Sequence, residues 1–165
     1  RKRRTKREAK VLSKAECNIP KLLSVDDEKM IIEMEYIDGD TLKDVLDDSK
    51  NRKDIVQNFA KQVAILHNQN IIHGDLTTSN AILKDNQVYL IDFGLSFFSH
   101  KLEDMATDLK LLNQAFESKH HKIFIECNKY FIQTYKKDAI RGNDVLERLV
   151  KVEKRGRYKG KSSKT

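Results

Sequence analysis

Three polar residues that could bind a metal ion or move a proton lie close together in the middle of the chain. Asp75 and Asn80 belong to the stretch "IIHGDLTTSN" (71–80), and Asp92 follows in "VYLIDFG" (88–94). Each lies beside an apolar, strand-like run, which would hold it in place. Carboxylate and amide oxygens are the ligands that Mg²⁺ prefers, and a free carboxylate can accept a proton. Each motif alone is also an ordinary turn, but together and in this order they predict a metal and phosphate site.

The spacing of these residues indicates the reaction. A His-x-Asp triplet, an Asn five residues after the Asp, and a later Asp-Phe-Gly are typical of the catalytic and metal loops of kinases. Asp75 would then accept or orient the proton of the acceptor hydroxyl. Asn80 and Asp92 would bind Mg²⁺, and Gly94 would let the backbone turn sharply. We therefore expect ATP and Mg²⁺ as cofactors.

The segments that carry these motifs predict an α+β domain that begins with a helix and a few strands. Met30, Ile32, Met34 and Tyr36 recur at every second position, with charged residues between the last three, as in a half-buried strand that follows a turn. Helices are expected over 5–16, 42–46 and 54–68, a turn at Asp26-Asp27, and short strands over 71–72, 81–83 and 88–91.

The second half of the body reads as helical from about Glu103 onward. Apolar residues recur there at helical spacing. Gly142 is expected to end the second of these helices, and Asn143 to cap a third. The predicted core positions are Met105, Leu109, Leu112 and Phe116 in the first helix, Ile123, Cys127, Phe131 and Tyr135 in the second, and Val145, Leu146 and Leu149 in the third.

Charge is distributed unevenly along the chain. The net charge is +7, yet residues 1–10 and 151–165 each hold seven Lys or Arg and one acid, so residues 11–150 carry 18 basic and 23 acidic side chains. An acidic body with two basic ends is compatible with solvated tails or with ends that bind phosphate backbones or an acidic partner surface. Gly156, Gly160, Ser162 and Ser163 predict a flexible C-terminal tail that orders on binding, which favours contact with a phosphate backbone or an acidic partner surface over mere solvation.

Size and cysteine content place the chain in a broad class. A chain of 165 residues suits one domain with a real core, and no apolar run is long enough to span a bilayer. Cys17 and Cys127 form no CxxC pair, which points to a reducing compartment. We expect a protein without membrane association that is cytoplasmic, and also nuclear if the source is eukaryotic.

Two departures from conventional protein kinases narrow the class. Gly74 stands between the His and the Asp, where those enzymes have Arg. From Gly94 to the helix near Glu103 there is almost no room for an activation segment. The "HGD" form is shared with aminoglycoside and choline kinases, so this loop alone leaves both a protein and a small molecule open as substrate.

Six stretches together resemble the PRPK-type atypical kinases of the KEOPS (EKC) complex. The resemblance runs in order along nearly the whole chain, and "HGDLTTSN" with the basic C-terminus is its most distinctive part. It implies a small two-lobed kinase fold with serine/threonine kinase or ATPase activity. It also implies a threonylcarbamoyl-transferase subunit and other KEOPS subunits as partners, and threonylcarbamoyladenosine formation in tRNA as the process. The stretches are "RTKREAKVL" (4–12), "MEYIDGDTLKDVL" (34–46), "IIHGDLTTSN" (71–80), "LIDFGLS" (90–96), "EDMATDLKLL" (103–112) and "VEKRGR" (152–157).

The resemblance carries further roles onto matching residues. Glu8 matches the helix glutamate that pairs with the ATP-binding lysine, although Thr5 and Glu8 also fit a helix capping box. Met34, Glu35, Tyr36 and Ile37 would form the hinge that holds adenine through backbone groups. His73 is expected to pack under the catalytic loop, and Asp108 to anchor that loop. His120 and His121 have no acidic or cysteine partner at ligand spacing, and we expect them at the surface or at a helix start.

A glycine-rich phosphate loop and the lysine of the third strand are missing from the sequence, so we expect an incomplete record of a longer chain. The predicted organisation is a partial N-lobe (1–37), a C-lobe (38–150) and a basic flexible tail (151–165). Two other functions stay open: a catalytically weak scaffold that holds tRNA through its basic ends, and a small-molecule phosphotransferase of the aminoglycoside or choline type.

Overall fold

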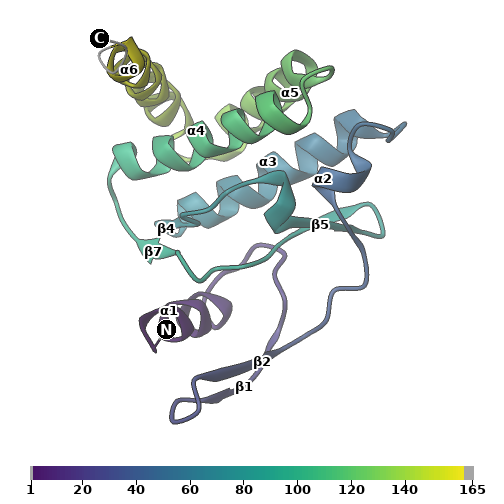
Figure 1. Ribbon diagram of the computed structural model, residues 1–165, viewed down its shortest axis with the longest axis vertical. Helices are drawn as coiled ribbons and strands as arrows, with labels where there is room; N and C mark the ends of the chain where they lie inside the picture. Colours follow the sequence, from purple (N-terminus) through teal and green to yellow (C-terminus); the bar gives the residue numbers. More distant parts are fainter. Residues whose placement is uncertain (1, 162–165) are drawn as a thin grey trace.

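The first part of the chain forms a small unit of one helix and one hairpin. A computed structural model describes residues 2–161, and Figure 1 shows this unit at one end of the molecule. The turn of the hairpin forms because the Asp26 carboxylate accepts the backbone N–H groups of Glu28 and Lys29 at 3.0 and 2.9 Å. The predicted turn is therefore confirmed. The elements are α1 (Lys2–Leu12), β1 (Leu22–Asp26) and β2 (Ile31–Met34), and the two strands pair antiparallel.

Two small antiparallel sheets lie between this unit and the helices. One has the strand order β3-β5-β6, and the other pairs β4 with β7. The β5–β6 turn places Asp85 and Asn86 at positive φ, 50° and 59°, which short polar side chains tolerate. The bounds are β3 (Asp40–Thr41), β4 (Ile71–Ile72), β5 (Ala81–Lys84), β6 (Gln87–Leu90) and β7 (Phe97–Phe98).

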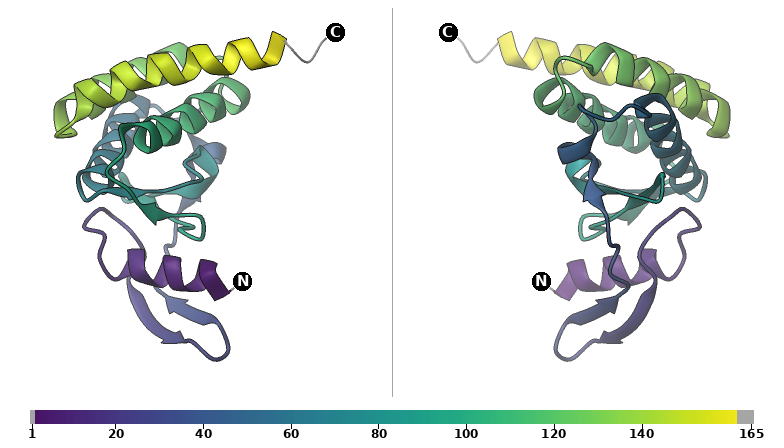
Figure 2. Two further views of the ribbon diagram at one scale, coloured as in Figure 1. Left: turned by 90° about the vertical axis from the view of Figure 1, so that its left-hand side faces the viewer. Right: turned by 90° about the vertical axis from the view of Figure 1, so that its right-hand side faces the viewer.

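Helices make up the rest of the fold and contain most of its core. Figure 2 shows α6 at the far end from the hairpin, lying across the neighbouring helices. Ile55, Phe59, Val63 and Leu66 of α3 are all buried, so the helical spacing predicted their packing correctly. The bounds are α2 (Leu42–Val45), α3 (Arg52–Asn68), the short 3₁₀ turn η1 (Thr78–Asn80), α4 (Leu102–Lys119), α5 (Phe124–Asp138) and α6 (Gly142–Lys161).

Most predicted core positions of the last three helices are also buried, and two lie at the margin of the core. Ile123 and Leu146 are half-buried and pack against the core. In the hairpin Leu22, Ile32 and Met34 pack partly against the core, whereas Met30 and Tyr36 are exposed. Within the described residues, no helix combines the length and the apolarity needed to cross a membrane.

The C-terminal segment differs from its prediction. Residues 142–161 form one continuous helix, so the basic segment is not a flexible tail as far as Lys161; Ser162 and Ser163 lie outside the described residues. Val152 is buried, and Arg155 donates to both carboxylate oxygens of Glu103 at 2.7 and 2.9 Å. These contacts offset the cost of about 1 kcal/mol for a glycine inside a helix.

Two predicted helix boundaries also need correction. The helix α6 begins at Gly142, one residue before the cap predicted at Asn143. The helix α1 is already formed at Lys2, so Thr5 lies inside it. A capping box needs its threonine at the N-cap, and that interpretation of Thr5 and Glu8 is therefore wrong.

Candidate active site

The catalytic loop runs from β4 to β5 and is built around the buried ring of His73. The backbone N–H of Asp75 donates to Nδ1 of His73 at 3.2 Å, so Nε2 carries the proton and donates to the Ile91 carbonyl at 3.0 Å. The ring also lies 4.9 Å from the ring of Phe93. Burial lowers the pKa of His73, which keeps the ring neutral. The prediction that His73 packs beneath the loop is confirmed.

Asp108 of α4 fixes the first residues of the same loop. Its side chain is 1% exposed and accepts the backbone N–H groups of His73 at 2.7 Å and Gly74 at 2.9 Å. The predicted anchor is thus confirmed. It also contacts Nε2 of His67 at 3.1 Å, and Nδ1 of His67 lies 2.7 Å from the Tyr135 hydroxyl. The sequence did not reveal His67 and Tyr135 as part of this anchor.

The loop brings Asn80 against Asp75. Nδ2 of Asn80 donates to the carbonyl oxygen of Asp75 at 2.9 Å and to its carboxylate oxygen at 3.0 Å. Both side chains are half-buried. Since the amide nitrogen faces Asp75, the amide oxygen of Asn80 is the atom left for a cation.

Asp92 follows β6 and lies exposed at the edge of the site. Its φ is 61°, in the left-handed region, and its Oδ1 accepts the N–H of Gly94 at 3.4 Å. The sharp bend predicted at Gly94 therefore occurs at Asp92 itself, and Gly94 has no positive φ. Aspartate tolerates this conformation because its short side chain can bond to the neighbouring backbone.

Gly74 explains the departure from the His-Arg-Asp pattern. It has a φ of 82°, and a Cβ at this position would lie 2.4 Å from the carbonyl oxygen of Leu95. No L-residue with a side chain fits without moving the backbone. The catalytic loop and the segment after Asp92 are therefore in direct backbone apposition.

Glu8 of α1 lies beside the metal loop, the segment around Asp92. Partial burial raises the pKa of Glu8, and the nearby Asp92 carboxylate raises it further, while a hydrogen bond from the Phe93 N–H lowers it. The structure thus brings Glu8 together with Asp92, 84 residues away in the sequence.

The predicted hinge, residues 34–37, connects β2 to the helical part. Ile37 is 4% exposed and Tyr36 is 83% exposed. The N–H of Glu35 donates to the Lys21 carbonyl at 2.8 Å, so this donor is already used. The segment predicted as the hinge therefore lies between the hairpin and the helical part, and the Glu35 N–H is not free for a ligand.

The prediction for the two adjacent histidines is half wrong. His121 is exposed, but His120 is completely buried at the C-terminal end of α4. Nδ1 of His120 lies 2.5 Å from Oδ1 of Asp47, and Nε2 lies 2.9 Å from Oγ1 of Thr78. His120 does have an acidic partner, 73 residues away, which no local spacing could indicate.

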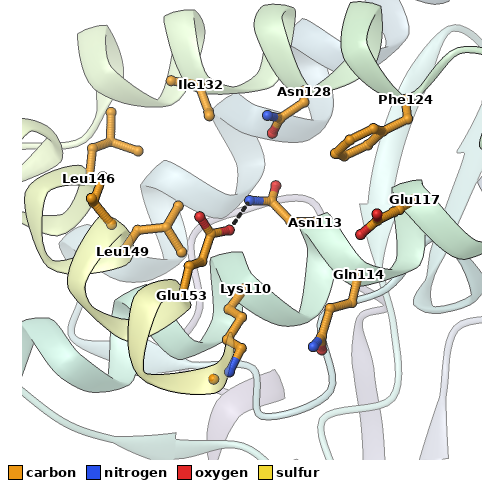
Figure 3. Close-up of a pocket in the computed structure, with 12 residues that line it drawn as sticks. Lys110, Asn113, Gln114, Glu117, Phe124, Asn128, Ile132, Leu146, Leu149 and Glu153 are labelled. Atoms are coloured by element: carbon orange, nitrogen blue, oxygen red, sulfur yellow. Dashed lines mark hydrogen bonds between the residues drawn. The ribbon is translucent and has the colours of Figure 1, made fainter. Parts of the chain in front are cut away.

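A groove of about 740 Å³ lies away from this site, between α4, α5 and α6. Figure 3 shows Asn113 and Glu153 bridging it through a 3.0 Å hydrogen bond. Among the described residues, Oδ1 of Asn128 is a buried side-chain oxygen without a partner. The groove is lined by none of the predicted site residues.

The geometry of the site is that of a protein kinase, and comparisons with known proteins agree with this class. The model of the protein kinase domain family matches residues 1–117. The KEOPS complex subunit Bud32 of Pyrococcus abyssi is 41% identical, and the alignment covers 98% of this chain and 77% of that protein. A probable serine/threonine-protein kinase, the BUD32 homolog of Archaeoglobus fulgidus, is 36% identical over 96% of this chain and 78% of its own length.

A third relative is a longer protein. The probable bifunctional tRNA threonylcarbamoyladenosine biosynthesis protein of Methanocaldococcus jannaschii is 40% identical over 96% of this chain, which spans only 29% of that protein. The chain belongs to the Bud32 family of protein kinases. The predicted resemblance, the α+β kinase-like fold and the serine/threonine kinase or ATPase class are confirmed.

Proposed function

We propose that this chain uses Mg²⁺ and ATP, with Asp75 receiving the proton of the attacking hydroxyl or water, and Asn80 and Asp92 binding the metal. One observation carries the proposal: a single Asn80 amide group bonds both the backbone and the carboxylate of Asp75. This contact fixes the Asp75 carboxylate, and it also points the amide oxygen of Asn80 away from Asp75. Such prepositioning is the main contribution of a protein to phosphoryl transfer.

The donor set suits Mg²⁺ bound together with a nucleotide. Among the described residues, no group of three or more His, Cys, Asp or Glu side chains is placed to hold a metal ion. One carboxylate and one amide oxygen are available instead, from Asp92 and Asn80. Mg²⁺ typically takes one or two protein carboxylates and fills its remaining positions with phosphate oxygens and water. When bound, the ion would neutralise charge on the transferred phosphoryl group.

Glu8 and the hinge complete the proposed nucleotide site. Glu8 lies beside Asp92, and a cationic partner there would lower its raised pKa and hold it ionised. For adenine, the carbonyl of Glu35 and the N–H of Ile37 are the backbone groups we propose, with Met34 and Tyr36 flanking them. We accordingly divide the chain into an N-lobe portion, 1–37, and a C-lobe from residue 38 onward.

The first test is ATP turnover by the full-length protein and by Asp92→Asn. Asparagine also tolerates the left-handed backbone conformation, so the variant removes the charge with little strain. We expect turnover to fall by about 10²-fold or more, since a metal ligand is lost. Asp54→Asn, at an exposed position of α3, is the matched control. Equal turnover in all three proteins would refute the assignment.

We further propose that the protein acts within a KEOPS-type complex, beside a threonylcarbamoyl-transferase subunit, in tRNA modification. The names of the relatives from P. abyssi and M. jannaschii support this. Two free, buried cysteines suit a reducing compartment such as the cytoplasm.

The position of the basic helices favours tRNA as the nucleic-acid partner. Residues 2–10 of α1 hold six Lys or Arg, of which all are exposed, and Lys151 and Lys154 of α6 are exposed as well. The first turn of α1 and the last turn of α6 lie on the same side of the molecule (Figure 2). A single extended polyanion could therefore contact both.

Charge reversal tests the tRNA contact better than truncation, since removing the end of α6 would also remove the buried Val152. Lys151→Glu with Lys154→Glu should weaken tRNA binding and reduce the slope of log affinity against log salt by about one to two units. Lys136→Glu with Lys137→Glu on α5 makes the same charge change elsewhere and serves as the control. Equal losses in both pairs would contradict a specific contact through α6.

The exposed basic helices also favour a second function, a scaffold that holds tRNA without using ATP. Turnover that depends on Asp92 and rises with the transferase partner and tRNA would establish the enzyme. Background turnover with intact tRNA binding would establish the scaffold.

A further inference from the structure

A chain of three side chains links the turn before α3 to the catalytic loop. It runs from the Asp47 carboxylate through the imidazole of His120 to the Thr78 hydroxyl, with separations of 2.5 and 2.9 Å. With a neutral ring, Nδ1–H donates to Asp47, and Nε2 accepts the hydroxyl proton of Thr78. Every polar atom of the ring is therefore used.

The arrangement has the residue types of a hydrolase triad, but its geometry excludes that role. The side chain of Thr78 is fully buried, as is His120, so no substrate can reach the hydroxyl. What the chain holds is η1, the turn Thr78–Asn80. The Asn80 N–H donates to the Thr77 carbonyl at 3.2 Å, and the Asn80 carbonyl accepts the N–H of Ile91 at 3.0 Å. Fixing Thr78 therefore fixes the backbone that aims the Asn80 amide.

The far end of the chain is itself anchored. Arg52, at the start of α3, donates through Nη2 to the Asp47 carbonyl and through Nε to the Leu46 carbonyl at 3.1 Å. Its Nη1 contacts the Glu126 carboxylate of α5 at 3.1 Å. Asp47 is thus held on both its backbone and its side chain, which makes it a firm support for a buried ring.

We propose that Asp47, His120 and Thr78 are positioning residues that hold the Asn80 turn, independently of Asp108, which holds the loop at His73 and Gly74. The catalytic loop then has two separate anchors, one at each end. The existence of the second anchor does not depend on the proposed function, whereas its effect on kcat rests on the proposed use of Mg²⁺ and ATP.

Thr78→Val tests the anchor because it removes the hydroxyl and keeps the shape, while Thr78→Ser restores the hydroxyl. Amide hydrogen exchange would be followed by NMR in the full-length protein. We expect the amides of Asn80 and Ile91 to exchange about tenfold faster in Thr78→Val, relative to the Asp108-bound amides of His73 and Gly74. Thr78→Ser should return this ratio close to the parent value. Asp47→Ala, at a partly exposed position, should shift it in the same direction by a smaller factor.

Kinetics supply the second measurement. We expect kcat for ATP turnover to fall about tenfold or more in Thr78→Val, since displacements near 1 Å at a reacting centre can cost about 10²-fold. The Mg²⁺ concentration needed for half-maximal rate should rise, and Thr78→Ser should recover both. Val145→Ala on α6 is the control for general destabilisation and should change neither kcat nor the exchange ratio.

Two results would overturn the proposal: an unchanged exchange ratio in Thr78→Val, or a loosened turn with unchanged kcat and Mg²⁺ dependence. Failure of the parent protein to turn over ATP would instead refute the proposed function. In that case the exchange ratio alone would still decide whether the anchor exists.

Discussion

The Asp108→Asn substitution gives the sharpest test of how the catalytic loop is held. The Asp108 side chain is 1% exposed and receives three donors: the His73 N–H and His67 Nε2 at one oxygen, and the Gly74 N–H at the other. An asparagine offers only one acceptor oxygen. Its NH₂ group must therefore face an N–H of the loop, and the least costly orientation gives up the bond to Gly74.

The size of the effect follows from that choice. A buried N–H left without a partner costs about 1–3 kcal/mol, and the remaining bonds lose the strength that a charged acceptor gives them. We expect the free energy of unfolding to fall by about 3 kcal/mol, a large part of the roughly 5–15 kcal/mol typical of a domain. We also expect kcat for ATP turnover to fall, because His73 and Gly74 directly precede Asp75.

The assay is urea unfolding followed by far-UV circular dichroism, since the chain has no tryptophan. Asp144→Asn, an exposed change in the first turn of α6, is the control and should stay within about 0.5 kcal/mol. A loss below about 1 kcal/mol in Asp108→Asn, with the Gly74 amide still protected from exchange, would show that this reasoning about the anchor is wrong.

Two further predictions concern neighbouring residues. Gly74→Ala should destabilise the protein by at least about 2 kcal/mol, because it combines a left-handed φ with a Cβ 2.4 Å from the Leu95 carbonyl oxygen. Gly94→Ala is the control, because a Cβ there would meet nothing closer than 3.5 Å, and it should be nearly neutral in the same urea experiment. Equal losses of unfolding free energy in the two variants would contradict the close contact between the backbones at Gly74 and Leu95. Burial lowers the pKa of His73 in the folded protein. Below the ordinary histidine pKa, the unfolded chain therefore binds a proton that the folded chain does not. The contribution of His73 to stability is thus present above that pKa and is lost as the pH falls below it. The free energy of unfolding should therefore drop by up to about 1.4 kcal/mol per pH unit below pH 6.5, and His73→Gln should remove that component; an identical pH slope in both proteins would exclude it.

The parts of the fold and site that the sequence predicted are those that depend on short-range pattern. The apolar spacing of α3, the turn after Asp26, and the approach of Asn80 to Asp75 all involve residues within one or two turns of each other. The physical cause is local: helical periodicity, a side-chain-capped turn and a fixed loop length each limit the backbone to few conformations.

The features that the sequence did not reveal depend on contacts between distant segments. His120 looked like a surface residue because its partners, Asp47 and Thr78, lie 73 and 42 residues away. The C-terminal segment looked flexible because its glycines and charges oppose helix formation, while the contacts that stabilise it, such as Arg155 with Glu103, span 52 residues. The bend after β6 was predicted at Gly94 because glycine permits sharp turns, yet the residue in the left-handed conformation is Asp92.

The close fit of Gly74 against Leu95 has a consequence for how such an enzyme can be switched. The catalytic and metal loops are joined three times over: by this backbone contact, by the hydrogen bond from His73 to Ile91, and by the packing of the His73 ring on Phe93. Swinging Phe93 out to disable the metal loop would therefore dismantle the catalytic loop as well. Glu8, by contrast, is carried by a separate helix, α1, and contacts the metal loop through the Phe93 N–H. We therefore expect the two loops to move as one body, and a shift of α1 to change the position of Glu8 relative to Asp92 without separating the loops.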